Sequence, residues 1–211
     1  MSSPRRVLNA VHSSLVSGRR FRVLAQHLAA RLPRDSRVLD VGTGDGALAL
    51  RIMQLRPDVT IEGLDVAIRP KVWISVGLFD GLHIPIECSS FDCVMLVDVL
   101  HHAQDASLLL REAVRVTRRQ LLIKDHLCEG ILASATLRFM DHVGNWGHDV
   151  AVRGKYFSET EWRDLISQTG AVIDERVDRL DIYPFPFTHI FDRRFQVLFE
   201  LRKKNKDNVK S

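Results

Sequence analysis

Three glycines spaced two residues apart form the clearest chemical signal in this 211-residue chain. Gly42, Gly44 and Gly46 follow the short apolar segment Val38–Val41, and an acidic residue, Asp40, lies two positions before the first glycine. A glycine lets the backbone approach a ligand where a Cβ atom would clash. The N–H groups at the start of a following helix then point at the bound molecule. The segment therefore predicts a loop that cradles a small polar ligand.

A dinucleotide-binding loop would show a different spacing. Its G-x-G-x-x-G fingerprint places two residues between the second and third glycines, and the third glycine serves the packing of helix against strand. In this chain a single residue, Asp45, separates the second glycine from the third. The pattern therefore disfavours an oxidoreductase with a nucleotide cofactor.

The glycine loop belongs to a regular alternation of strand-like and helix-like segments. Short apolar runs predict buried strands, and apolar residues three and four positions apart predict helices. We expect strands at 37–42, 59–64, 72–76, 91–97 and 120–124, and helices at 14–32, 46–55 and 106–116. This alternation predicts a parallel sheet with helices on both faces, whose carboxyl strand ends border a ligand crevice.

The alternation breaks over residues 127–157, a connection long enough to be functional or to contain short helices of its own. Ser158–Glu161 then has the sequence of a capping box, which predicts the start of a helix. Gly170 is suited to the position that follows the end of that helix. Two further strands are predicted at 172–182 and 195–202, joined by a link that contains Tyr183–Phe187.

The ordered motifs over residues 36–126 resemble those of the class I S-adenosylmethionine-dependent methyltransferases. Asp40–Gly46 matches the first motif of that family, and Asp65 follows the second strand, where the family has an acid. Later motifs of the family are matched by Phe79–Gly81, Ser90–Asp92, Val97–His102 and Leu109–Val116. The resemblance implies S-adenosyl-L-methionine as cofactor and S-adenosyl-L-homocysteine as product. The cofactor-binding residues that it implies are Asp40, Gly42, Thr43, Gly44, Gly46, Asp65, Val66, Asp80, Gly81 and Asp98.

The resemblance also implies separate roles for the acids. In the family, the acid after the second strand accepts hydrogen bonds from the ribose hydroxyls, which implies this role for Asp65. The acid after the third strand takes the adenine amino group, which implies that role for Asp80. Each assignment has a structural alternative: Asp65 begins a helix, Asp80 is a plain turn residue, Asp98 is a satisfied strand-end carboxylate, and His101 and His102 are structural.

The fold class that follows is α/β, a Rossmann-like, seven-stranded, mostly parallel sheet with helices on both faces and an antiparallel last strand. We expect an N-terminal helical segment at 1–36, the cofactor-binding methyltransferase domain at 37–202 and a basic tail at 203–211. Within the domain, 127–157 is expected to be an insertion on the acceptor side. The family often has Pro-Gly-Gly before the fifth strand, whereas this chain has Thr117–Gln120, so the geometry of that turn is expected to differ.

Methyl transfer is an in-line displacement, so the protein supplies positioning and, for a hydroxyl acceptor, a base. Candidate groups at the strand ends are Asp98, His102, Asp125 and His126. We predict that His126 borders the acceptor and takes its proton, because histidine has a suitable pKa. No Asp/Asn-Pro-Pro-aromatic motif follows the fourth strand. By resemblance, its absence favours O- or C-methylation over methylation of an amide or base nitrogen.

Residues 127–157 should supply acceptor specificity. An apolar pocket with polar anchors, or simple packing, is predicted for Phe139, Met140, Trp146, Tyr156, Phe157, Asp141, His142 and His148.

The helix at 14–32 is expected to close over the cofactor as a lid or to present its arginines to an acidic acceptor or a phosphate. No metal site is expected at His83, His101 and His102, because adjacent histidines do not share one face of a strand or helix.

The charge of the chain is divided between its ends and its body. Residues 1–37 contain eight arginines and one acid, and residues 202–211 contain five basic residues and one acid, so the net charge of +4 hides an acidic body. Solvated helix faces and a frayed tail explain this pattern, and a nucleic-acid partner is not expected. The alternatives are an RNA or protein methyltransferase that grips through its basic ends, and a non-catalytic nucleoside-binding module.

The composition is typical of a reducing compartment. Cys88, Cys93 and Cys128 are too few for a disulfide framework. No run approaches the about 20 apolar residues of a membrane helix, and Arg5 and Arg6 are not followed by the apolar core of a signal peptide. We therefore predict a cytoplasmic protein with a small-molecule acceptor and no membrane span. Nothing in the sequence predicts an oligomeric state.

Overall fold

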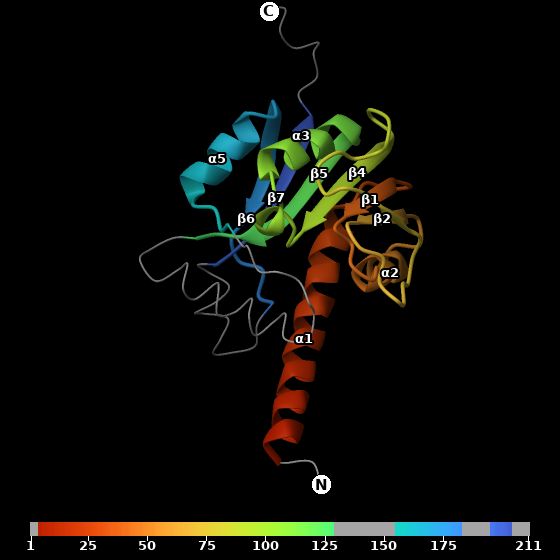
Figure 1. The fold of residues 1–211 in the computed structure, drawn as a ribbon, viewed down its shortest axis with the longest axis vertical. Helices are drawn as coiled ribbons and strands as arrows, with labels where there is room; N and C mark the ends of the chain where they lie inside the picture. The colour runs from red at the N-terminus through yellow and green to blue at the C-terminus, as the bar shows by residue number, and fades with distance from the viewer. Residues whose placement is uncertain (1–3, 129–154, 183–194, 204–211) are drawn as a thin grey trace, which may run out of the picture.

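A seven-stranded sheet forms the centre of the computed structural model, which describes residues 4–128, 155–182 and 195–203, the side chains of 4–17 excepted. The strand order is β3-β2-β1-β4-β5-β7-β6 (Figure 1). The strands are β1 (Arg37–Val41), β2 (Thr60–Asp65), β3 (Val76–Leu78), β4 (Phe91–Val97), β5 (Thr117–His126), β6 (Ala171–Val177) and β7 (Gln196–Lys203). The first five pair in parallel, and β7 runs antiparallel to β5 and β6. The predicted fold class is confirmed.

Helices cover both faces of the sheet, as predicted (Figure 1). One face packs against α1 (Pro4–Arg31) and α2 (Ala47–Leu55), and the other against the 3-10 helix η1 (Leu100–His102), α3 (Ala106–Val116) and α5 (Glu159–Ser167). Successive strand residues point to opposite faces, so Met95 joins the core under α1 and α2 whereas Val94 and Leu96 join the other core. Among the described residues, no helix combines the length and apolar content needed to cross a membrane.

Side chains determine where the helices begin and end. Asp105 caps α3 by accepting a backbone N–H bond in its first turn at 2.9 Å. Ser158 and Glu161 form the predicted capping box at the start of α5. Arg56, just after α2, donates to carbonyl oxygens at the end of α1, those of Ala29 (2.8 Å), Leu32 (2.9 Å) and Pro33 (3.1 Å). Because a cation is favourable at a helix carboxyl end, Arg56 ties α1 to α2.

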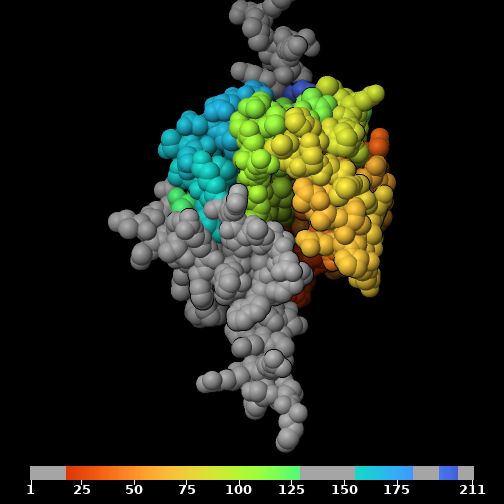
Figure 2. Space-filling view, viewed as in Figure 1, coloured from red at the N-terminus to blue at the C-terminus, as the bar shows by residue number. Residues whose placement is uncertain are grey.

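The third strand is shorter and later than expected. The prediction placed it at 72–76, but β3 begins at Val76 and pairs with the end of β2 at the edge of the sheet. The N–H of Trp73 donates to the carbonyl oxygen of Asp45 at 2.8 Å, so the start of the expected strand is held by the glycine loop, and the chain first bonds to β2 at Ser75, whose carbonyl oxygen accepts the Gly63 N–H at 2.9 Å. This region forms part of the outer surface (orange to yellow in Figure 2), where Trp73 is 47% exposed. Residue types predicted a strand here but carry no information about an available partner strand.

Other elements differ from expectation at their ends. The first helix begins at Pro4 instead of residue 14, since proline is well tolerated in a first helical turn. β5 begins at Thr117, directly after α3, so the expected turn at Thr117–Gln120 is part of the strand. β6 stops short of residue 182, because Leu180 and Ile182 turn into the core beneath α1.

The carboxyl ends of β1 and β4 mark the point where the order of the strands reverses. β1 lies between β2 and β4, so the chain builds outward in both directions from this pair. Open α/β sheets bind ligands in the crevice at such a point. The glycine loop leaves the sheet after β1, and Asp98 leaves it after β4.

We expect Ser158→Ala to lower the free energy of unfolding by about 1 kcal/mol, because the first turn of α5 loses a side-chain acceptor. Thr160→Ala, an exposed change in the same turn, is the control and should shift stability by less than about 0.5 kcal/mol. Urea denaturation of both variants measures the difference. Equal stabilities of the two variants would contradict the capping role.

Candidate functional site

The glycine loop after β1 depends on close approaches that only glycine allows. Gly42, Gly44 and Gly46 have positive φ angles of 77°, 65° and 77°. A Cβ atom on Gly42 would lie 2.5 Å from Val99 Cγ2, and one on Gly46 would overlap Ile74 Cγ1. A Cβ atom on Gly44 would meet no atom of the described residues within 4 Å. The loop therefore has crowded ends and an open middle, where a ligand can approach bare backbone.

Asp65, at the end of β2, is joined to this open part of the loop. The N–H of Gly44 donates to Asp65 Oδ2 at 2.7 Å, and the N–H of Ala67 donates to Oδ1 at 3.1 Å. A carboxylate has about four acceptor positions, so Asp65 can accept about two more donors, as many as a vicinal diol provides. No helix follows Asp65, so the alternative that it begins a helix is wrong.

Asp40 lies buried beneath the loop and accepts a hydrogen bond from Thr43 Oγ1 at 2.7 Å. Burial raises the pKa of Asp40 to about 7, the charge of Asp65 adds to the rise, and the Thr43 bond opposes it. Such a carboxyl group is partly protonated near neutral pH. A cation that binds beside it favours the ionised form.

The turn after β3 lies against the residue that follows β2. A Cβ atom on Gly81 would lie 3.0 Å from Val66 Cγ1, so the structure brings Val66 and Gly81 together. Asp80 instead serves its own turn: Oδ1 accepts the N–H groups of Leu82 and His83, both at 2.7 Å, and the His83 ring lies 3.0 Å from Oδ2. These backbone bonds lower the pKa of Asp80 to about 2. Its carboxylate keeps about one acceptor position for a further donor.

Asp98, directly after β4, is held between two cations. Its φ angle of 56° is rare for a residue with a side chain, and such strain persists only where surrounding contacts impose it. Lys124 Nζ donates to Oδ1, and Arg20 donates to Oδ2 at 2.7 Å. Burial would raise the pKa of Asp98, but the charges of Lys124, Arg20 and His126 outweigh it and hold the pKa below its usual range.

Arg20 and Lys124 are residues of the site that the sequence analysis missed. Lys124 is fully buried in β5, and burial lowers its pKa while Asp98 opposes the change. A lysine after the apolar run Leu121–Ile123 requires a buried counter-ion, and this requirement is a signal that could have identified it. Arg20 lies among several arginines of α1, so no pattern distinguishes it in the sequence.

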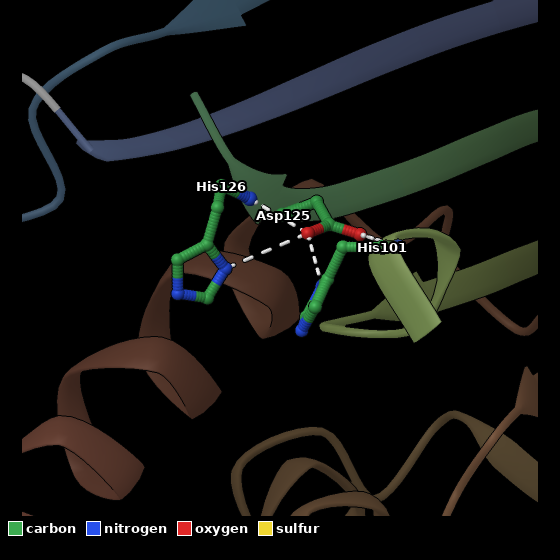
Figure 3. A group of neighbouring side chains, drawn as sticks. All are labelled: His101, Asp125 and His126. Carbon is green, nitrogen blue, oxygen red and sulfur yellow. Dashed lines mark hydrogen bonds and ion pairs between the residues drawn. The ribbon is translucent and has the colours of Figure 1, made fainter. Parts of the chain in front are cut away.

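Asp125, at the end of β5, holds η1 against the strand (Figure 3). Its Oδ1 accepts from His101 Nδ1 at 2.6 Å and from the N–H of His126 at 2.7 Å. Its Oδ2 accepts from the N–H groups of Leu100 and His101 at 3.0 and 3.3 Å. Burial would raise the pKa of Asp125, but His101 and His126 outweigh it and keep the carboxylate ionised. The bond to Nδ1 orients the His101 ring, as an aspartate orients histidine in catalytic dyads.

The same three side chains have a spacing that could hold a metal ion. Ligand atoms of His101, Asp125 and His126 all lie within 4.8 Å of one another. The four bonds that Asp125 accepts occupy about all of its acceptor positions, however, and leave no lone pair for a cation. Lys124, next in the strand, adds a positive charge. The group is therefore better explained as a hydrogen-bonded hub, in which Asp125 is the shared acceptor for His101, His126 and Leu100, than as a metal centre.

His126 is buried beside this hub. Its Nδ1 lies 3.6 Å from Asp98 Oδ1 and 3.5 Å from Asp125 Oδ1. The His126 ring lies edge-on to His101, with 4.9 Å between centroids, and 5.8 Å from Tyr156. Burial lowers the pKa of His126, the bond to Asp125 opposes this, and the charge of Lys124 adds to the lowering. A neutral imidazole that can accept a proton is the expected state at neutral pH.

The predicted acceptor side is only partly within the described residues. Tyr156 is buried against His101 at 5.6 Å between ring centroids, and Phe157 packs on Trp162 at 5.0 Å. Outside the described residues lie Phe139, Met140, Asp141, His142, Trp146, His148, the link Tyr183–Phe187 and the tail from residue 204. Tyr156 is thus the one predicted specificity residue that the described structure brings next to His101 and His126.

The raised pKa of Asp40 generates a stability prediction. In the folded chain Asp40 keeps its proton up to about pH 7, whereas an unfolded aspartate loses it near pH 4. The contribution of Asp40 to stability is therefore largest below about pH 4 and falls as the pH rises to about 7. We expect Asp40→Asn, which cannot ionise, to be more stable than the parent by about 2–4 kcal/mol at about pH 8, with a smaller difference at about pH 5. Urea denaturation at both values tests this, and an unchanged difference would contradict it.

Comparison with known proteins places the chain in a family. The family model described as "Methyltransferase domain" matches residues 16–175. The chain is 29% identical over 110 residues to a 27-O-demethylrifamycin SV methyltransferase of Amycolatopsis mediterranei, covering 45% of this chain. It is 31% identical over 95 residues to a demethylmenaquinone methyltransferase of Roseiflexus castenholzii, covering 41% of this chain. Each match spans only 40% of the relative's own length.

A solved structure shares the fold. The SAM-dependent methyltransferase from Thermotoga maritima superposes with a TM-score of 0.62 at 21% identity, over 95% of this chain and 97% of that chain. The family model covers most of the present chain, including the glycine loop and the strands that carry Asp65, Asp98 and Asp125. The chain therefore belongs to the methyltransferase domain family, in which S-adenosyl-L-methionine is the methyl donor.

Proposed function

We propose that this chain transfers a methyl group from S-adenosyl-L-methionine to a small, lipophilic acceptor, by O- or C-methylation, and releases S-adenosyl-L-homocysteine. The observation that carries the proposal is the Asp65 carboxylate, which is tied to the open loop backbone at Gly44 and still has about two acceptor positions. Family membership supports the same donor. The donor supplies an activated methyl group on a sulfonium, and the protein supplies binding, orientation and proton transfer.

Residues around the loop divide the work of holding the donor in this proposal. Asp65 accepts hydrogen bonds from the ribose hydroxyls, Val66 and Gly81 border the adenine, and Asp80 offers its remaining acceptor position to the adenine amino group. Asp40 becomes fully ionised when the cationic donor binds nearby. The loop backbone and the end of β4 complete the set, through Gly42, Thr43, Gly44, Gly46 and Asp98.

The acceptor is proposed to lie at the carboxyl end of β5, bordered by His126. As the acceptor oxygen attacks the methyl carbon, its proton passes to the neutral imidazole, and the bond from carbon to sulfur breaks. The buried position of His126 and its lowered pKa support this role. The relatives named for demethylrifamycin and demethylmenaquinone support an acceptor of the small-molecule class.

The basic N-terminus gives less support to an RNA or protein acceptor. Arg20 pairs with Asp98, Arg31 with Glu175 at 3.0 Å, and Arg19 donates to a backbone carbonyl oxygen at 3.1 Å. Part of the excess of arginines is therefore already paired with groups of the chain itself. A polyanion would have to displace them, and a steep fall of binding with salt would then be measured.

The donor assignment predicts the behaviour of Asp65→Asn. The amide keeps the size of the side chain but loses the charged acceptor, so we expect the Kd for S-adenosyl-L-homocysteine to rise about 10- to 100-fold. Asp45→Asn, on the same loop and exposed, is the matched control and should bind as the parent does. Calorimetry measures all three proteins. A parent that binds no S-adenosyl-L-homocysteine refutes the donor, and an Asp65→Asn variant with parental affinity refutes the ribose contact.

The base assignment predicts the behaviour of His126→Ala. Removal of a general base should lower kcat about 100-fold or more while donor binding stays at the parental level. Mass spectrometry of a panel of hydroxylated quinones and aromatic hydroxyl compounds, incubated with the donor, identifies an acceptor for the assay. Turnover by His126→Ala equal to that of the parent would show that His126 is not the base. The absence of turnover on any small molecule, with turnover on RNA or protein, would favour the other acceptor class.

A further inference from the structure

An accessible ion pair lies beside the glycine loop. The guanidinium of Arg20 and the carboxylate of Asp98 are 2.7 Å apart, and their side chains are 34% and 22% exposed. Val99, the next residue, is the one that the Gly42 backbone approaches. Asp98 is therefore next to the point where the loop after β1 meets the end of β4, the crevice in which the proposed donor binds.

Asp98 already has a permanent partner without Arg20. Lys124 is fully buried in β5 and donates to Oδ1, and the N–H of Asp98 donates to the Lys124 carbonyl oxygen at 2.8 Å. Arg20 reaches the other oxygen, Oδ2, from a different layer, α1. The buried lysine balances the charge of Asp98, and the partly exposed arginine is a second cation that a ligand can reach.

We propose that Arg20 and Asp98 together bind the amino-acid end of the donor, an inference that rests on the proposed function. That end carries one ammonium and one carboxylate. Arg20 binds the carboxylate, for which its planar fork of N–H donors is suited, and Asp98 Oδ2 accepts from the ammonium. Without the donor, the two side chains bond to each other, so neither charge is left in the crevice without a counter-charge. Arg20 is thus a donor-binding residue contributed by α1.

The position of α1 is consistent with this role. Figure 1 shows its first turns projecting beyond the sheet, while Leu24, Leu28 and Leu32 are buried in the core beneath it. His27 Nε2 also donates to the carbonyl oxygen of Leu180 at 2.9 Å. The helix is therefore anchored to the core over the turns that follow Arg20, and the Arg20 guanidinium is held at the crevice by its bond to Asp98.

The test compares two ligands that differ in the amino-acid end, which Arg20 and Asp98 are proposed to bind. S-adenosyl-L-homocysteine carries the amino acid, whereas 5′-methylthioadenosine has the same nucleoside and sulfur without it. For Arg20→Ala we expect the Kd of S-adenosyl-L-homocysteine to rise about 10- to 100-fold, with the Kd of 5′-methylthioadenosine within about threefold of the parental value. Arg20→Lys should lose less, because it keeps the charge. Arg19→Ala, next to it on α1 and exposed, is the matched control and should leave both values unchanged.

Calorimetry with the full chain separates the outcomes. A selective loss for S-adenosyl-L-homocysteine supports the proposal, and parental binding of 5′-methylthioadenosine shows in the same experiment that the variant is folded. Unchanged or tighter binding of S-adenosyl-L-homocysteine by Arg20→Ala overturns it, as does an equal loss for both ligands. If the parent binds neither ligand, the assignment of S-adenosyl-L-methionine as methyl donor is refuted, which is distinct from a refutation of the role of Arg20.

Discussion

The hydrogen bond from the Gly44 N–H to the Asp65 carboxylate is the contact on which the ligand crevice depends. It joins the loop after β1 to the end of β2, and the N–H groups of Gly42 and Thr43 reinforce it by donating to the Leu64 carbonyl oxygen at 2.7 and 3.1 Å. The loop backbone therefore has a defined orientation before any ligand arrives, which reduces the entropic cost of binding. The conformation at Gly44, with a φ angle of 65°, is one that a residue with a side chain rarely adopts.

Four aspartates at the carboxyl edge of the sheet differ in chemistry because the hydrogen-bond donors and cations around each carboxylate differ. Asp125 accepts four N–H bonds and is saturated, so it can position η1 but cannot bind a ligand. Asp65 accepts two and keeps room for a diol. Asp98 balances two cations, whereas Asp40 accepts a hydrogen bond from the Thr43 hydroxyl, with no cation paired to it in the described part of the chain, and holds its proton near neutral pH. Residue type alone could not separate these roles, because each depends on contacts made after folding.

The parts that were predicted correctly from the sequence are those with local causes. The alternation of apolar runs predicted the sheet and its helices, the Ser158–Glu161 capping box follows from contacts within a few residues, and the glycine loop was identified by the spacing of its glycines. The parts that were missed depend on distant partners. Arg20 and Asp98 are 78 residues apart in the chain, and Lys124 and Asp98 are 26 apart. The misplaced third strand has the same origin, since Trp73 is held by the loop carbonyl of Asp45.

The end of β5 shows why the strand register matters to this site. Successive side chains point to opposite faces, so Lys124 and His126 face the α1 side of the sheet while Asp125 faces η1. Pairing of Lys124 with Val97 in β4, and of His126 with Gln196 in β7, fixes this alternation. A slip of one residue would turn Asp125 away from His101 and Lys124 away from Asp98. The long pairing of β5 with both neighbouring strands therefore holds Lys124 at Asp98 and Asp125 at His101 at the same time, because both residues lie at the end of this one strand.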